Sequence, residues 1–236
     1  MKKILGGCIP LMLLLVFASF TPPQTNSMVS ARLKVQKVSN GKKIVIEADV
    51  LYHIDKKEIS IHYSYPEEFV FVSNILGETK IYFPRKNEVM LQNNDVLSAD
   101  TDILFLFFNQ NMSEMGLKNL GFELVSSENK ENYHITRWVP PHKIENIAEV
   151  ELVFEDYIPI YTSFISQKHE TVSKTYYSDY RYFNDHFIPL QVTEITYLSA
   201  TDSIVSRKNY SDLKYGTQIR SDLVNFEIPF DAKAIK

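Results

Sequence analysis

One apolar stretch, Ile-Leu-Phe-Leu-Phe-Phe at residues 103–108, interrupts a sequence whose other segments are mostly strand-like. Before it, four short strand-like runs follow one another closely, at 57–65, 68–72, 79–83 and 88–92. Because the connections between them are so short, these strands can pair only with their neighbours, in an antiparallel meander. The combination predicts a curved antiparallel sheet with an apolar plug or lid, which is typical of a container rather than a catalyst.

Alternation of apolar and polar residues supports the strand prediction. In residues 43–50, Ile44, Ile46, Ala48 and Val50 alternate with polar side chains, as a half-buried strand requires. After the apolar stretch, similar patterns predict strands at 122–126, 133–139, 149–154, 158–165, 171–183, 188–197 and 203–213. About eleven strands are too many for a flat open sheet. We therefore expect a mainly β fold whose bent sheet has a concave face to be filled by side chains, a helix or a ligand.

The apolar stretch itself is predicted to be helical. Asp100 and Asp102 precede it, where carboxylates can accept hydrogen bonds from the unpaired N–H groups of a helix start. Apolar side chains surround this helix, so it must be covered on most sides, either as an ordinary core helix or in contact with a ligand. Met112, Met115 and Leu117 predict a second short helix at 113–120, and we expect one to three helices over the sheet.

The first residues resemble a secretory signal. Lys2 and Lys3 form a positive start, and residues 8–20 are apolar over a length typical of a signal peptide and short of the ~20 residues that span a bilayer. We predict a signal peptide at 1–18 with cleavage after Ala18, a leader or linker at 19–40 and one domain at 41–236. An uncleaved N-terminal anchor is the alternative. Export across the inner membrane would place the protein in the periplasm.

Removal of the signal peptide also removes the only cysteine, Cys8, so the mature chain has no disulfide and no thiolate site. Roughly 210 residues can bury about 70% of their unfolded surface, which suffices for a single domain. The formal net charge is −4 and becomes −6 without Lys2 and Lys3. Without a basic stripe, a nucleic-acid partner is not expected.

No catalytic pattern is present. The sequence has no Gly-x-Ser-x-Gly, His-Glu-x-x-His, Walker or Gly-x-Gly-x-x-Gly motif, and only seven glycines. His53 and His62 could approach each other across a hairpin, but a zinc site needs three or four ligands and no third is evident, so two solvent-facing polar positions explain them better. We predict a protein that is not an enzyme, with no catalytic residues, no metal site and no cofactor.

Several segments resemble the periplasmic lipoprotein carriers LolA and LolB and the related sensor RseB. Pro66-Glu-Glu-Phe-Val70, Asn74-Ile-Leu-Gly77, Ile81-Tyr-Phe-Pro84 and Asn87-Glu-Val89 look like the family's progression of strand, turn, strand, proline and strand, and the segment Phe226-Glu-Ile-Pro-Phe-Asp-Ala232 is similar to its closing strand. The resemblance covers residues 44–232. It implies an unclosed β-barrel, or half-barrel, whose concave face is covered by lid helices and holds acyl chains.

On this basis the expected function is a periplasmic carrier that moves a hydrophobic cargo toward the outer membrane in a lid-covered groove. Its partners would be the acyl chain of a lipid or lipoprotein and inner- and outer-membrane transport proteins, with transient membrane contact and a monomeric state. The alternative is an envelope sensor or assembly module on the same fold. The residues expected to form the groove and lid are Ile59, Ile61, Tyr63, Phe69, Phe71, Ile81, Phe83, Val89, Leu104, Phe107 and Phe108.

Overall fold

Fourteen strands join in one sheet in the part of the chain that the computed structural model describes, residues 27–93, 102–108, 112–141, 144 and 146–235. The predicted signal peptide, residues 1–18, lies outside these residues. The strands are β1 (Met28–Ser39), β2 (Lys42–His53), β3 (Glu58–Tyr65), β4 (Phe69–Asn74), β5 (Glu78–Phe83), β6 (Glu88–Asn93), β7 (Glu123–Lys130), β8 (Tyr133–Val139), β9 (Ile147–Glu155), β10 (Ile158–Ser166), β11 (Thr171–Phe183), β12 (His186–Tyr197), β13 (Ser203–Tyr215) and β14 (Lys233–Ile235).

Two meanders make up the sheet. Strands β1 to β6 pair in sequence order, β7 to β13 do the same, and β1 pairs with β13 to join the two halves. All neighbouring strands are antiparallel except β14, which pairs in parallel with β6 at one edge. The other edge is β7, so the sheet does not close into a barrel.

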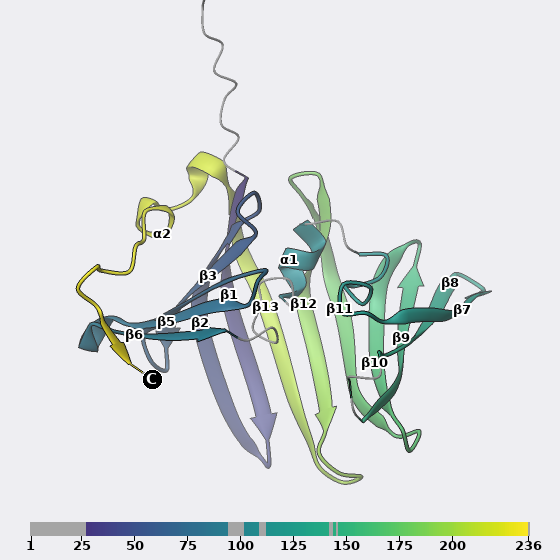
Figure 1. Cartoon of the computed structure of the whole chain (residues 1–236). Coiled ribbons are helices and arrows are strands. Elements are labelled where there is room, and N and C mark those ends of the chain that lie inside the picture. The colour runs from purple at the N-terminus through teal and green to yellow at the C-terminus, as the bar shows by residue number, and fades with distance from the viewer. Residues whose placement is uncertain (1–26, 94–101, 109–111, 142–143, 145, 236) are drawn as a thin grey trace, which may run out of the picture.

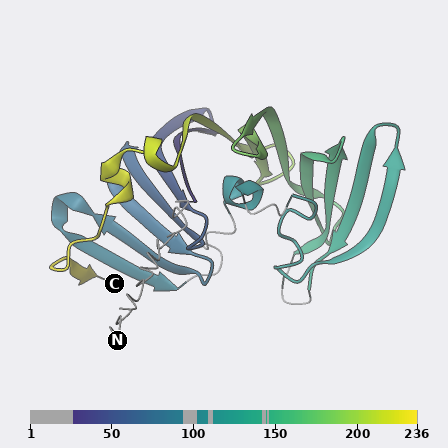
Figure 2. The same cartoon turned by 90° about the horizontal axis from the view of Figure 1, so that it is seen from above.

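The sheet is bent into an arch, which Figure 2 shows from above. Register shifts interrupt the pairing of β1 with β13, β2 with β3, β9 with β10 and β7 with β8. Such bulges bend a strand and increase its twist, and with the intrinsic twist of fourteen strands they account for the curvature. The mainly β, unclosed fold predicted from the sequence is confirmed, with more strands than expected.

The two faces of the sheet are covered differently. The helix α1 (Ile103–Phe108) lies in the hollow of the arch, on what we call the groove face (Figures 1 and 2). A C-terminal strap, defined here as residues 216–235, crosses the outer face of the first meander. It contains the 3₁₀ turn η4 (Gly216–Gln218), the helix α2 (Ser221–Val224) and β14. Another 3₁₀ turn, η1 (Pro84–Lys86), joins β5 to β6.

Buried apolar residues form three clusters that follow these two faces. The large cluster lies on the groove face and includes α1 together with residues of both meanders. Two small clusters lie on the outer face, where the strap covers Leu51 with Ile219 and Leu223, and covers Val70, Tyr82 and Val89 with Phe226 and Ile228.

Strand β1 corrects the predicted leader at 19–40, because residues 28–39 lie inside the sheet between β2 and β13. Val29, Ala31 and Leu33 alternate along it and are buried on the groove face. The domain therefore includes residues on the N-terminal side of position 41.

Two further expectations are wrong in detail. Residues 112–121 form consecutive turns in place of a second helix, because Met115 and Gly116 both have positive φ, which a right-handed helix does not accommodate. Residues 226–232, matched to a closing strand, have no regular structure, and β14 begins only at Lys233.

Candidate functional site

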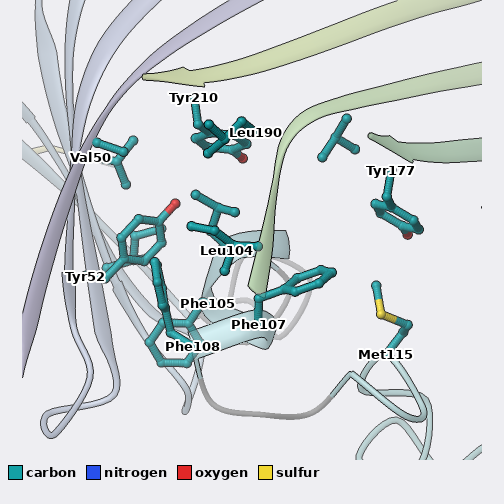
Figure 3. Packing of buried hydrophobic residues seen from close by; sticks show 14 of the residues in the cluster. Val50, Tyr52, Leu104, Phe105, Phe107, Phe108, Met115, Tyr177, Leu190 and Tyr210 are labelled. Carbon is teal, nitrogen blue, oxygen red and sulfur yellow. The ribbon is translucent and has the colours of Figure 1, made fainter. Parts of the chain in front are cut away.

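The groove face is filled at its centre by α1. All of its residues except Ile103 are buried, and Leu104 and Phe107 are 0% and 1% exposed. Figure 3 shows these side chains packed between the two meanders, with Val50 and Tyr52 from the first. A six-residue helix is too short to be stable alone, so its structure depends on these contacts.

Asp102 fixes the beginning of α1. Its Oδ1 accepts hydrogen bonds from the backbone N–H groups of Leu104 and Phe105, at 3.0 and 3.2 Å. The same oxygen accepts the hydroxyl of Tyr52 at 3.1 Å. Burial, with a smaller contribution from Asp102, raises the pKa of Tyr52 well above its ordinary value, so this hydroxyl keeps its proton and remains a donor. The predicted capping role of Asp102 is confirmed, while Asp100 lies outside the described residues.

His186 fixes the end of the helix. Its Nε2 donates to the carbonyl oxygen of Phe108 at 3.0 Å, and its Nδ1 lies 2.6 Å from the carbonyl oxygen of Asn184. Since carbonyl oxygens only accept, each of these bonds requires a hydrogen on the ring nitrogen that makes it. The rings of Phe108 and Tyr52 meet edge to face with their centroids 5.3 Å apart. The ring centroids of Phe107 and Tyr180 are 6.0 Å apart.

Seven predicted groove residues lie on this same face of β3 to β5. Ile59 and Ile61 belong to the large cluster, and Tyr63 and Phe71 pack against it. Cross-strand pairs place the others beside them, because directly opposed residues point to the same side. These pairs are Tyr63 with Phe69, Ile61 with Phe71, and Phe71 with Ile81, and the rings of Phe69 and Phe83 are 6.2 Å apart.

Beyond α1, these residues leave a strip of half-buried apolar side chains. The rings of Tyr63 and Phe69 stack at 4.2 Å, and Phe71, Ile81 and Phe83 continue the strip across β4 and β5. The strip extends the apolar floor of the groove toward the edge of the first meander. It is a part of the groove face that remains partly accessible with α1 in place.

Val89 is misplaced in the predicted groove. It pairs with Tyr82 and clusters with Val70 beneath the strap, on the outer face. The preceding strand places Ile81 and Phe83 on the groove face, so Tyr82 and its partner Val89 face the other way. Leu104, Phe107 and Phe108 do lie in the groove, as residues of α1.

The second meander supplies half of the groove floor, and the prediction of site residues missed it. Tyr177, Ile188, Leu190, Val192 and Tyr210 are all buried in the large cluster. The alternation of Ile188, Leu190 and Val192 along β12 was the sequence signal that could have found them. Tyr210 is 4% exposed and its hydroxyl has no hydrogen-bond partner among the described residues. A buried unpaired hydroxyl costs about 1–3 kcal/mol.

A small cavity adjoins the beginning of α1. It has a volume of about 160 Å³ and lies between Ile103 and strands β11 to β13. Its walls combine apolar Tyr177 and Val192 with polar Thr175, Glu194, Ser206 and Lys208. The groove therefore has one polar end.

The two histidines considered for a metal site lie apart in the β2–β3 pair. His53 is opposite Glu58, whereas His62 is opposite Asp49. His62 is hydrogen-bonded to Ser60 at 2.8 Å. Within the described ranges, no three His, Cys, Asp or Glu side chains come together as a metal would require. Nor does any helix in those ranges have the length and apolar character to cross a membrane.

The fold and the site together define a class of protein. Its members have an arched, unclosed antiparallel sheet with a helix in the hollow of the arch. This is the fold of LolA superfamily proteins. A LolA superfamily protein of Nitrosomonas europaea superposes with a TM-score of 0.56 at 11% identity, covering 86% of this chain and 91% of the other. A Vibrio parahaemolyticus domain provisionally assigned to outer membrane lipoprotein sorting gives 0.55 at 12%, with 86% and 91% covered.

A DUF1329 family protein of Desulfovibrio piger has the same fold, with a TM-score of 0.57, 12% identity and coverage of 85% and 90%. No protein-family model and no curated protein sequence matches the chain. The resemblance noted from the sequence is thus confirmed at the level of the fold.

Proposed function

We propose that this protein binds and carries the acyl chain of a lipid or lipoprotein in the periplasm, without enzymatic activity. The observation that carries the proposal is α1, a short and wholly apolar helix lying in the hollow of a LolA-like sheet. An apolar plug of this kind occupies space that an acyl chain could occupy instead.

The energetics of an acyl cargo favour such an enclosure. At ~0.8 kcal/mol per CH₂, removing a 16-carbon chain from water is worth about 12 kcal/mol, so an aqueous carrier has to enclose it. The carrier also has to release the acyl chain. If the chain displaces α1, one set of apolar contacts on the floor replaces another, and the net free energy stays moderate.

Three features of α1 support displacement. Its helical structure depends on packing, its polar attachments are concentrated at Asp102 and His186, and it leaves the hydroxyl of Tyr210 buried without a hydrogen-bond partner among the described residues. The half-buried strip from Tyr63 to Phe83 offers a first contact for a chain that then moves beneath the helix.

The cellular setting belongs to the same proposal. A signal peptide at residues 1–18, cleaved after Ala18, would deliver a monomer to the periplasm. There it would meet membrane transport proteins at both membranes and touch the bilayer transiently. The Vibrio parahaemolyticus domain supports this setting through its provisional assignment to outer membrane lipoprotein sorting.

The only tryptophan provides the test. Trp138 is buried in the large cluster on the groove face. Brominated fatty-acid esters added to the purified protein should quench its fluorescence saturably, at one equivalent per chain. Native mass spectrometry of gently isolated protein should show co-purified acyl species. Unquenched fluorescence together with a clean unliganded mass would contradict the proposal.

A second candidate is an envelope sensor or assembly module on the same fold, and the close packing of α1 favours it, since Leu104 to Phe108 are all buried. The variant Phe107→Asp separates the two. It should abolish acyl binding and cellular function together in a carrier, whereas a module would keep its function and a stable protein crosslink. Circular dichroism would first establish that the variant is folded.

A further inference from the structure

The small cavity at the polar end of the groove is lined by charged and hydroxyl side chains, which binding of an acyl chain does not require. Lys208 projects from the groove floor of β13 between Val192 of β12 and Val35 of β1, which are its two cross-strand neighbours. It is half-buried and makes no ion pair with any described residue. A half-buried ammonium group without an ion-pair partner is free to bind the negatively charged group of a ligand.

Glu194 provides an acceptor on the opposite side of the same cavity. It lies on β12 between Thr175 of β11 and Ser206 of β13. Its carboxylate accepts one hydrogen bond, from the hydroxyl of Thr196 at 3.4 Å, and forms no ion pair in the part of the chain described. Ser206 and Lys208 are two positions apart, so Glu194 and Lys208 are diagonal neighbours that face the same space.

The cavity adjoins the groove, because Tyr177 and Val192 belong both to its walls and to the large cluster. Ile103, the first residue of α1, forms part of its wall. Tyr210 follows Lys208 on the same face of β13, and in Figure 3 it points into the space around Leu104. Its hydroxyl, which has no hydrogen-bond partner among the described residues, is a further polar group on this face of β13. At about 160 Å³ the cavity has room for several waters, and hence for a head group of a few heavy atoms, but not for a long chain.

We infer that this cavity receives the head group of a zwitterionic phospholipid, with the phosphate at Lys208 and the ammonium group at Glu194, while the acyl chains occupy the groove. The inference rests on the proposed acyl binding and specifies its ligand. The polar side chains of the cavity would then select the head group, and the apolar floor would bind any chain.

Calorimetry on the full chain with three dihexanoyl probes tests the inference. These are phosphatidylethanolamine, phosphatidylglycerol, which lacks the ammonium group, and diacylglycerol, which is uncharged. Phosphatidylethanolamine should bind most tightly. Lys208→Met should weaken it by at least about tenfold and leave diacylglycerol unchanged, because a hydrogen-bonded charge pair is lost. Glu194→Gln should weaken phosphatidylethanolamine but not phosphatidylglycerol.

Arg207→Met is the matched control, because Arg207 is the adjacent cation on the other face of β13 and bonds Thr193 there. It should leave all three affinities unchanged. Equal affinities for the three probes, or equal weakening of all three by Lys208→Met, would overturn the head-group assignment and leave acyl binding intact. Absence of binding by every probe would overturn the proposed function as well.

Discussion

The sheet has two covers that differ in what holds them. On the outer face, the strap is fixed by backbone pairing of β14 with β6 and by an ion pair of Arg220 with Asp49 of β2 at 3.0 Å. On the groove face, α1 has no strand partner and is held by apolar packing with Asp102 and His186 at its two ends.

Under the proposed function, this difference distinguishes a permanent cover, the strap, from α1 as a cover that an acyl chain can displace. A backbone ladder can be replaced only by another strand, whereas apolar packing can be replaced by any apolar group of suitable shape. We therefore expect changes in the strap to alter stability alone, and changes in α1 to alter stability and ligand binding together.

Truncation after Arg220 is expected to have the largest effect. It uncovers Val70, Tyr82 and Val89, removes Leu223 from its cluster with Leu51 and leaves the edge of β6 unpaired. Burial of four such side chains contributes about 6–12 kcal/mol, which is comparable with the whole stability of a domain. The truncated chain should aggregate or unfold at 25 °C, as measured by circular dichroism and light scattering.

Phe230→Ser is the control for the truncation, because Phe230 belongs to the strap and is fully exposed. It should leave the unfolding transition almost unchanged. A truncated chain as stable as the full one would mean that the strap does not contribute to the fold.

Phe107→Ala tests the packing of α1. The side chain is 1% exposed, and such truncations cost about 3–5 kcal/mol of unfolding free energy. Urea denaturation would measure the loss. A saturating acyl ligand should reduce the difference from the wild type, because α1 is displaced in both complexes. If the full deficit persists with ligand bound, α1 stays in the groove and the exchange model is wrong.

Asp102→Ala should loosen the beginning of α1. Loss of the cap costs about 1–2 kcal/mol, and the hydroxyl of Tyr52 loses its acceptor. Since displacement of the helix then requires less free energy, acyl affinity should rise by about five- to thirtyfold while the protein becomes less stable. Asp102→Asn retains capping oxygen and should behave like the wild type. Unchanged or weaker acyl binding by Asp102→Ala would contradict the model.

A smaller, pH-dependent effect is expected beneath the strap. Burial lowers the pKa of His62 below its ordinary value of 6.5, against the attraction of Asp49 and Asp222. The ring of His62 packs on Phe226 with centroids 4.7 Å apart. Because its folded-state pKa is below the unfolded value, this contact is fully stabilising above pH 6.5 and weakens as pH falls through the folded-state pKa.

Amide hydrogen exchange of residues 222–228 should therefore be faster at pH 5.5 than at pH 7.5, after correction for intrinsic exchange rates. His62→Gln should remove most of that difference. Identical corrected rates at both pH values in the wild type would show that His62 has no such role.

The sequence predicted α1 better than any other element. A polar cap followed by six apolar residues predicts a helix that is covered on most sides. The structure has a helix at these residues, and five of its six side chains are buried. Strands β2 to β6 were also predictable from their sequence patterns, and with them the position of seven candidate groove residues on one face of the sheet. That the sheet is curved could be predicted from the number of strands alone.

Other elements were harder to predict, because their local sequence patterns are ambiguous. Strand β1 was missed although Asn40-Gly41, both with positive φ, is a typical two-residue hairpin turn between alternating segments. The phase of β6 was ambiguous because Val89 lies next to Met90, and either could face the groove. Residues 112–121 have helical spacing, but nothing in that spacing reveals the positive φ of Met115.

Hydrogen exchange at the amides of α1, with and without a saturating acyl ligand, tests the central claim most directly. The reporter is the bond from the N–H of Leu106 to the carbonyl of Asp102, 3.1 Å in the unliganded protein. An exchangeable cover predicts that these amides lose protection when the ligand binds, while the strands beneath gain it. Greater protection of α1 in the complex would contradict the account, because the helix would then be a fixed part of the core.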